Sequence, residues 1–335
     1  MKQLQQKGNI QMATGLGFGS SQPGRVLSAL KQASPISRRR LYVIGAAVQA
    51  EVQGFIRGNC LQEEVERLGE IHELWKKARA HFRSLEATEA FLPEKVRVNE
   101  TEPELGSFLA QLRNDPLFER AYGEAPYQIK KVELRNLVAC QRHVDLDFVD
   151  TLKERLTQSM TREQLAAFCL LPAIAPPLPK CQQLAPNVYG FSSPNTDFRF
   201  LGGFVRPLTQ EDVQACWMGG EPAAAVVLLL GYGAPSMNAF QVGQRIVLSN
   251  GFHRAYALLS CGISDAYLVV RNVADPGLEF PAQLVGLPRE YLLGSPRPAV
   301  VGDFLNPSLV QEFECTVGVR SIQLAWNANQ TQVPI

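Results

Sequence analysis

The segment Gln244–Val270, QRIVLSNGFHRAYALLSCGISDAYLVV, constrains the fold more than any other part of this 335-residue chain. An apolar run, Ile246–Leu248, stops at Ser249-Asn250-Gly251. A short helical pattern and Gly262 follow, and a second apolar run covers Ala266–Val270. This order predicts a strand, a tight turn, a helix and another strand.

The turn places His253 and Arg254 in the first turn of the predicted helix. There, free backbone N–H groups and the positive end of the helix dipole favour an anion. The sequence therefore predicts a phosphate-binding corner at Asn250–Arg254.

Charge and cysteine content narrow the class of protein. The net charge of +1 gives no overall electrostatic case for nucleic acid or an acidic membrane. Residues 1–60 are basic and residues 61–124 are rich in Glu, which favours a solvated segment facing the acidic helix over a nucleic-acid-binding arm. Seven scattered cysteines without a CxxC pair are typical of reduced thiols, so we expect a cytoplasmic protein.

No membrane segment is expected. The chain does not open with the pattern of a secretory leader. Its most apolar stretch, Leu41–Ile56, is shorter than the ~20 residues that a span needs and contains Glu51. A helix that is buried or faces a partner is the better interpretation.

The pattern along the chain predicts an α+β (mixed α/β) protein, with a helical N-terminal region followed by a small mixed-sheet domain. Helical periodicity from about Arg25 to Leu92 carries an apolar stripe that we interpret as a core face rather than a partner groove. Ala223–Leu230 (AAAVVLLL) has the composition of a strand buried on both faces. The predicted parts are a mobile segment (1–23), a helical region (24–124), the mixed-sheet domain (125–275, with an insertion at about 158–221) and a C-terminal extension packing on that domain (276–335).

Shorter signals place further elements. Ile129–Ala139 has the alternation of a strand, and Asp145–Leu156 is typical of a helix with acids in its first turn. Thr161 and Gln164 form a capping box before another helix. The Pro/Gly-rich stretch Pro276–Pro298 is predicted to be irregular.

These elements carry a resemblance. A strand ending in Asn250-Gly251-Phe252-His253-Arg254, an Ala-containing helix, Gly262 and a following strand resemble the ParB/sulfiredoxin superfamily over roughly residues 129–273. The resemblance implies a small mixed fold that binds nucleotide phosphates at this turn. In it, Gly251 would admit the phosphate to the backbone, His253 and Arg254 would donate hydrogen bonds to its oxygens, and Asn250 would cap the helix.

The alternative for the same residues is structural. In that interpretation Arg254 pairs with a carboxylate such as Asp147 or Asp265, and His253 only packs.

Departures from the family pattern limit the chemistry. Sulfiredoxin-like enzymes carry a reactive Cys where this chain has Phe252, so reductase activity is not expected. Gln141 stands where related free-serine kinases have a carboxylate base, and His143 or Asp145 could replace it only after a shift in register. The residues after 275 lack the helical periodicity of the helix-turn-helix module found in chromosome-partitioning ParB proteins.

Three functions remain open. The first is nucleotide binding with hydrolysis or phosphoryl transfer, which would use ATP or CTP with Mg²⁺ and the catalytic candidates His143, Asp145 and His253. Glu133 and Asp147 are the carboxylates available for the metal, whereas the spacing of His and Cys argues against structural zinc. The second is a ParB-like DNA-binding protein or nuclease. The third is a non-catalytic adaptor on a degenerate ParB-like scaffold, with a protein partner bound by the helical N-terminal region.

Overall fold

The computed structural model of the chain describes residues 37–157, 159–172, 175–195, 197–215, 222–329 and 331–332. The predicted mobile segment 1–23 and the first part of the predicted helical region lie outside these residues. The described residues combine helices with mixed sheets, so the predicted α+β class is confirmed.

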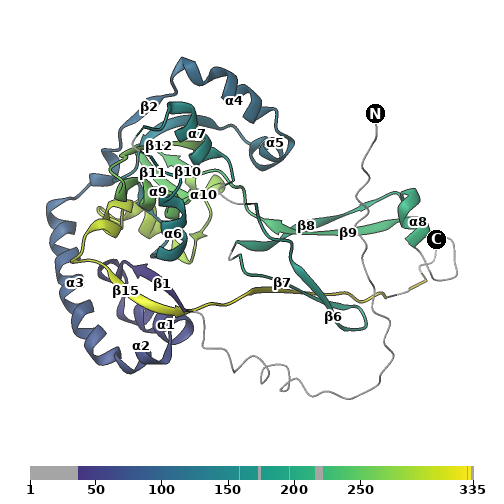
Figure 1. Cartoon of the computed structure of the whole chain (residues 1–335), viewed down its shortest axis with the longest axis horizontal. Helices are drawn as coiled ribbons and strands as arrows, with labels where there is room; N and C mark the ends of the chain where they lie inside the picture. Colours follow the sequence, from purple (N-terminus) through teal and green to yellow (C-terminus); the bar gives the residue numbers. More distant parts are fainter. Residues whose placement is uncertain are drawn as a thin grey trace. The chain divides into compact units, whose positions relative to one another are not determined.

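Both strands of the predicted strand–turn–helix–strand segment belong to a six-stranded mixed sheet (Figure 1). β11 (Arg245–Asn250) leads through Gly251 into α9 (Phe252–Ser260), and β12 (Asp265–Asn272) follows. The apolar centres of β11 and β12 are buried, as their composition requires. The remaining strands are β2 (Val98–Glu100), β3 (Gln128–Glu133), β4 (Val138–Ala139) and β10 (Asn238–Val242). The order is β2-β3-β12-β10-β11-β4, with β10/β12 and β11/β4 parallel and the other pairs antiparallel.

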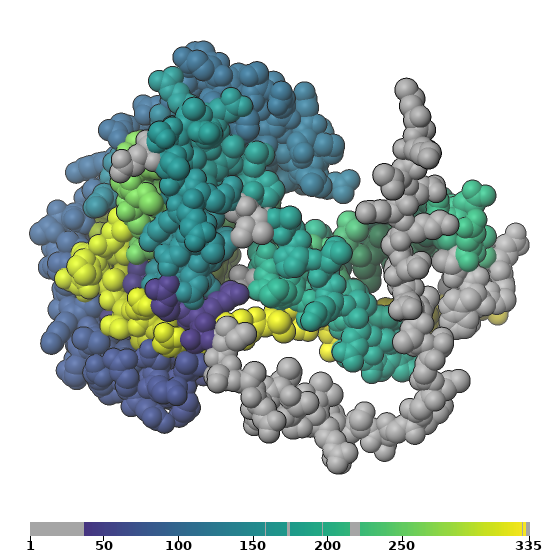
Figure 2. All heavy atoms as spheres, viewed as in Figure 1, coloured from purple at the N-terminus to yellow at the C-terminus, as the bar shows by residue number. Residues whose placement is uncertain are grey.

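A second sheet joins three distant parts of the chain. β1 (Ser37–Tyr42) lies between β15 (Gln311–Thr316) and β5 (His143–Asp145) and is antiparallel to both. The space-filling view shows part of the C-terminal region, in yellow, against β1, in purple (Figure 2). The prediction of helix throughout Arg25–Leu92 is therefore wrong at Ser37–Tyr42, because pairing with two strands more than 100 residues away outweighs the local pattern.

Most of the described part of that region after Val48 is helical, as predicted. It forms α1 (Gln49–Asn59), α2 (Gln62–Glu66) and α3 (Leu68–Thr88). The buried stripe of α3, namely Ile71, Ala78 and Phe82, faces the core, and Trp75 donates its indole N–H to the Ala47 carbonyl at 3.0 Å.

The stretch Leu41–Ile56 is not the single helix that was expected. It contains the end of β1, a 3₁₀ turn η1 (Ile44–Ala46) and most of α1. Within the described residues, no helix is both long and apolar enough to cross a membrane.

Local capping signals locate several other helices. Asp145 caps α6 (Leu146–Lys153), and Thr161 and Gln164 form the predicted capping box of α7 (Arg162–Leu170). Pro276–Pro298 is less irregular than predicted, since it contains α10 (Pro276–Glu279), the strand pair β13 (Gln283–Leu284) and β14 (Leu287–Pro288), and α11 (Arg289–Gly294). The other helices are η2 (Leu92–Glu94), η3 (Pro103–Leu105), α4 (Gly106–Arg113), α5 (Pro116–Tyr122), α8 (Gln210–Ala215) and η4 (Val301–Leu305).

The main hydrophobic cluster does not follow the predicted domain boundaries. It contains Leu41 and Phe82 from the helical region, Val132 from the sheet domain and Phe304 from the C-terminal extension. One core therefore includes residues from three of the predicted ranges.

The described part of the predicted insertion contributes three strands, which pair with one another or with strands that lie outside it. β6 (Lys180–Ala185), β7 (Val188–Ser193) and β16 (Arg320–Ala325) form a sheet in the order β16-β7-β6. β8 (Phe198–Arg206) and β9 (Ala225–Tyr232) form a separate antiparallel hairpin. The expectation that Ala223–Leu230 is buried on both faces is wrong, because Val226 is 73% exposed within this chain.

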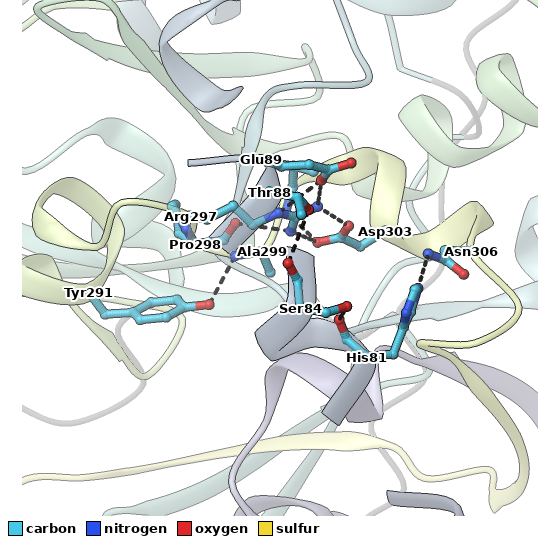
Figure 3. Close-up of polar contacts among 11 residues, drawn as sticks. His81, Ser84, Thr88, Glu89, Tyr291, Arg297, Pro298, Ala299, Asp303 and Asn306 are labelled. Atoms are coloured by element: carbon cyan, nitrogen blue, oxygen red, sulfur yellow. Dashed lines mark hydrogen bonds and ion pairs between the residues drawn. The ribbon is translucent and has the colours of Figure 1, made fainter. Parts of the chain in front are cut away.

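A buried ion-pair network holds the C-terminal segment to the end of α3 (Figure 3). Arg297 is 2% exposed, and its Nη1 and Nη2 donate to the two carboxylate oxygens of Asp303 at 2.6 and 2.8 Å. Nη2 also donates to Glu89 Oε2 at 2.8 Å. The two carboxylates supply the counter-charge that a buried guanidinium needs.

We expect Arg297→Met to lower the free energy of unfolding by about 3–5 kcal/mol, because it leaves the Asp303 carboxylate buried without its cation. Urea denaturation of the purified protein measures this loss. Lys76→Met is the control, since both side chains of the Lys76–Glu73 pair on α3 are exposed and removal of this pair should have a much smaller effect. Equal losses in the two variants would contradict the role given to the network.

Candidate functional site

The turn between β11 and α9 has the predicted form. Gly251 is the N-cap residue of α9 and has a left-handed φ of 105°. A Cβ at this position would lie 2.6 Å from Cγ of Met237. Both the backbone conformation and the contact with Met237 therefore require glycine here.

The prediction that Asn250 caps α9 is wrong. Its Nδ2 donates to the Ala234 carbonyl at 2.8 Å, and α9 has no side-chain cap. Asn250 instead ties the turn to the segment that precedes β10, so its side chain is already engaged within the chain.

Arg254 is turned into the protein and is 7% exposed. Its Nη1 donates to the carbonyls of Phe168, Cys169 and Leu171 at 3.2, 2.8 and 3.2 Å, and its Nη2 donates to the carbonyl of Pro235. Three of these acceptors are at the C-terminal end of α7, where the helix dipole favours a cation. Burial lowers the pKa of Arg254 to about 10, so the side chain remains charged at neutral pH.

The carboxylate partners considered for Arg254 have other partners. Asp147 accepts from Arg39, and Asp265 forms an ion pair with Arg97 at 3.5 Å. The structure thus supports a structural role for Arg254, but through backbone carbonyls rather than through an acid.

His253, His143 and Asp145, the three catalytic candidates, are close enough to influence one another's ionisation. Burial is the main reason that the pKa of each imidazole is lowered to about 4, and the charge of Arg40 lowers both as well. Asp145 acts in the opposite direction. Both imidazoles are therefore neutral at pH 7, and neither brings a positive charge to a phosphate.

Aromatic rings surround the two imidazoles. The ring of His253 meets that of Phe148 edge-on, with centroids 5.3 Å apart. The ring of His143 stacks on Tyr42, with centroids 6.3 Å apart, and also lies near Phe55. The two imidazoles and Asp145, which we call the histidine cluster, therefore lie among β1, β5, α1, α6 and α9.

Acidic side chains occupy the N-terminus of α6, and arginines from β1 neutralise them. Asp145 accepts from the backbone N–H of Phe148 at 3.0 Å and from Arg38 Nη1 at 3.2 Å. Asp147 accepts from the backbone N–H and Nε of Arg39 at 3.0 and 2.8 Å. Arg39 Nη2 also donates to Asp150 at 2.7 Å. The anion-favouring end of this helix is thus filled by the chain itself.

The sequence pattern does not predict that these arginines pair with α6, because it places the basic segment opposite the acidic residues 61–124. The run Arg38–Arg40 was the available signal, but its acidic partners are more than 100 residues away in the sequence. Only the pairing of β1 with β5 brings the two sets together.

The carboxylates considered for a metal ion are on different elements. Glu133 ends β3 and accepts from the backbone N–H of Arg97 at 3.4 Å, whereas Asp147 is in α6. Among the described residues, no group of three or more His, Cys, Asp or Glu side chains is arranged to hold a metal ion.

Comparisons of the chain with protein-family models, with curated proteins and with solved structures find no match. The resemblance to the ParB/sulfiredoxin superfamily therefore stays a prediction from the sequence.

The two imidazoles should make the protein sensitive to acid. Their folded-state pKa of about 4 is below the ~6.5 of an unfolded histidine, so protonation favours the unfolded chain. Their contribution to stability is complete above pH ~6.5 and is lost as the pH falls towards 4, at about 1.4 kcal/mol per pH unit for each imidazole.

Denaturant unfolding of wild type and of His253→Gln between pH 7.5 and 4.5 tests this. The variant should lose less stability than wild type over the same interval, because one titrating group has been removed. Parallel curves would show that His253 is not held neutral in the folded protein.

Proposed function

We propose that the protein is a non-catalytic adaptor whose ParB-like core acts as a scaffold with a closed phosphate corner. The observation that carries this proposal is the position of Arg254, the only cationic side chain of the Asn250–Arg254 turn at neutral pH. Its guanidinium is buried and binds four backbone carbonyls. Turning it towards a ligand would leave those carbonyls without a donor, which is costly inside a protein.

The charges around α6 also support the proposal. A bound phosphate would approach the carboxylates of Asp145 and Asp147 at the start of this helix, and like charges repel. The nearby cations Arg38 and Arg39 are already paired with those carboxylates. Because these arginines are engaged within the chain, they also give little support to nucleic-acid binding.

An adaptor needs a surface for its partner, and the β8–β9 hairpin offers one. Cross-strand pairs Phe200–Leu230, Gly203–Leu228 and Val205–Val226 lie on one face, which we call the hairpin face. None of these residues is charged, and Val205 and Val226 are 69% and 73% exposed.

Exposed apolar patches commonly mark binding sites. We infer that the partner is a protein with an uncharged apolar surface, bound by the hairpin face rather than by the helical region. The apolar stripe of α3 is already used in the core.

A second candidate is nucleotide-phosphate binding at the His143–Asp145–His253 cluster, with ATP or CTP and Mg²⁺. The observation that favours it is the convergence of these three residues beside Arg40. Neutral imidazoles could still donate hydrogen bonds or transfer a proton.

Thermal unfolding with ATP, CTP, ADP or GTP, each with and without Mg²⁺, separates the two candidates. For the adaptor we expect an unchanged midpoint, whereas a ligand at about 100 times its dissociation constant would add about 2.7 kcal/mol of stability. A rise in midpoint that disappears in His253→Gln would overturn the adaptor proposal. Arg254→Met is not suitable as the main test, because it should lower the midpoint even without nucleotide.

The double variant Val205→Lys/Val226→Lys tests the hairpin face. We expect chemical cross-linking to recover protein partners with wild type that it does not recover with the double variant. Lysines buried in the interface would oppose an apolar contact. The control is Leu278→Lys, which changes an 86% exposed apolar residue on α10.

Sedimentation of the purified chain is measured first, since a second copy could also cover the hairpin face. A dimer abolished by the double variant would make this face a self-association surface and contradict its use for another protein. Partners captured equally by wild type and the double variant would also contradict the proposal.

A further inference from the structure

Cys60 and Cys315 form a close pair of buried thiols far from the turn at Asn250–Arg254 in the sequence. Their sulfur atoms are 3.4 Å apart, although the residues are separated by 255 positions. Cys60 is the C-cap residue of α1 and is 8% exposed, whereas Cys315, in β15, is fully buried.

The backbone at this pair suits a covalent link. Cys60 and Cys315 are opposite each other in an isolated antiparallel bridge. The hydrogen bond of this bridge is made by the neighbouring residues, with Leu61 N–H donating to the Glu314 carbonyl at 2.9 Å, while Cys60 N–H donates to Ile56 within α1. The cysteines are therefore a non-hydrogen-bonded pair, for which Cα atoms are typically about 4.5 Å apart, within the ~4.4–6.8 Å that disulfides span.

The surroundings favour reaction at one of the two thiols. A hydrogen bond with Cys60 is the main cause that lowers the pKa of Cys315; burial opposes it, and the nearby charge of Arg40 acts in the same direction as the hydrogen bond. The same hydrogen bond, together with burial, raises the pKa of Cys60. Such a pair presents one nucleophilic sulfur and one resolving thiol.

We propose that Cys60 and Cys315 are a modification site that a peroxide converts into an intramolecular disulfide. The Cys315 thiolate attacks one peroxide oxygen, the O–O bond breaks, and Cys315 becomes a sulfenic acid while hydroxide leaves and is protonated to water. The Cys60 thiol then attacks that sulfur, the S–S bond forms, the S–O bond breaks and a second water leaves. The two thiols lose two electrons, and the peroxide is reduced to two waters.

The bond would fasten α1 covalently to β15 until a thiol reduces it. β15 pairs with β1, which separates it from β5 and whose Arg38 neutralises Asp145 at the start of α6. Closing so long a loop should raise the thermal midpoint of the oxidised protein, because it restricts the unfolded chain. This inference does not depend on the proposed function.

The test treats the full chain with hydrogen peroxide under native conditions, followed by alkylation, proteolysis and mass spectrometry. We expect a peptide linked through Cys60 and Cys315 that disappears after dithiothreitol, and a higher thermal midpoint that dithiothreitol reverses. Cys60→Ser should give neither result. Cys181→Ser/Cys261→Ser should give both, because these exposed cysteines are outside the pair.

Recovery of Cys60 and Cys315 only as separate alkylated peptides after peroxide treatment would overturn the proposal. So would a linked peptide whose formation leaves the thermal midpoint of wild type no higher than that of oxidised Cys60→Ser. Neither readout involves nucleotides or protein partners, so failure here is distinct from failure of the adaptor proposal.

Discussion

The contact between Arg254 and the backbone carbonyls around α7 constrains the rest of this structure. A buried guanidinium requires acceptors in a low-dielectric interior, and the C-terminal end of a helix provides unpaired carbonyls together with a negative dipole end. Arg254 satisfies both requirements at once and fastens α7 and the Pro235 segment to the start of α9. A residue that could have bound a ligand therefore stabilises the fold instead.

At α6, too, residues of the chain take the place that a ligand could occupy. Its N-terminus could attract an anion, but Asp145 and Asp147 fill that position. β1 then supplies Arg38 and Arg39 as counter-charges, which removes the electrostatic attraction for a phosphate. The start of α6 is thus neutralised by the protein itself, and the one cationic side chain at the start of α9 is used inside the fold. By contrast, Val205 and Val226 of the apolar hairpin face are 69% and 73% exposed.

Several elements could be predicted because their signals are local. The strand–turn–helix at β11 and α9 follows from an apolar run, a glycine that must adopt positive φ, and helical periodicity. The capping box of α7 is equally local, since Thr161 and Gln164 are three residues apart. β1 could not be found in this way, because its strand conformation depends on β5 and β15. The AAAVVLLL run indicated a strand correctly, but composition reports the preference for burial and not whether the same chain supplies the cover.

The sequence by itself determined the α+β class, the position of the turn, the need for glycine at 251 and the set of polar residues near it. The tertiary structure decided what those residues do. Which acceptors a side chain binds depends on the groups that the fold brings near it. For Arg254 the acceptors are carbonyls within residues 168–171 and at residue 235, up to 86 positions away in the sequence. The same holds for the pairing of Arg38 and Arg39 with α6 and for the approach of Cys60 to Cys315. Such contacts depend on how distant segments pack, which local periodicity does not encode.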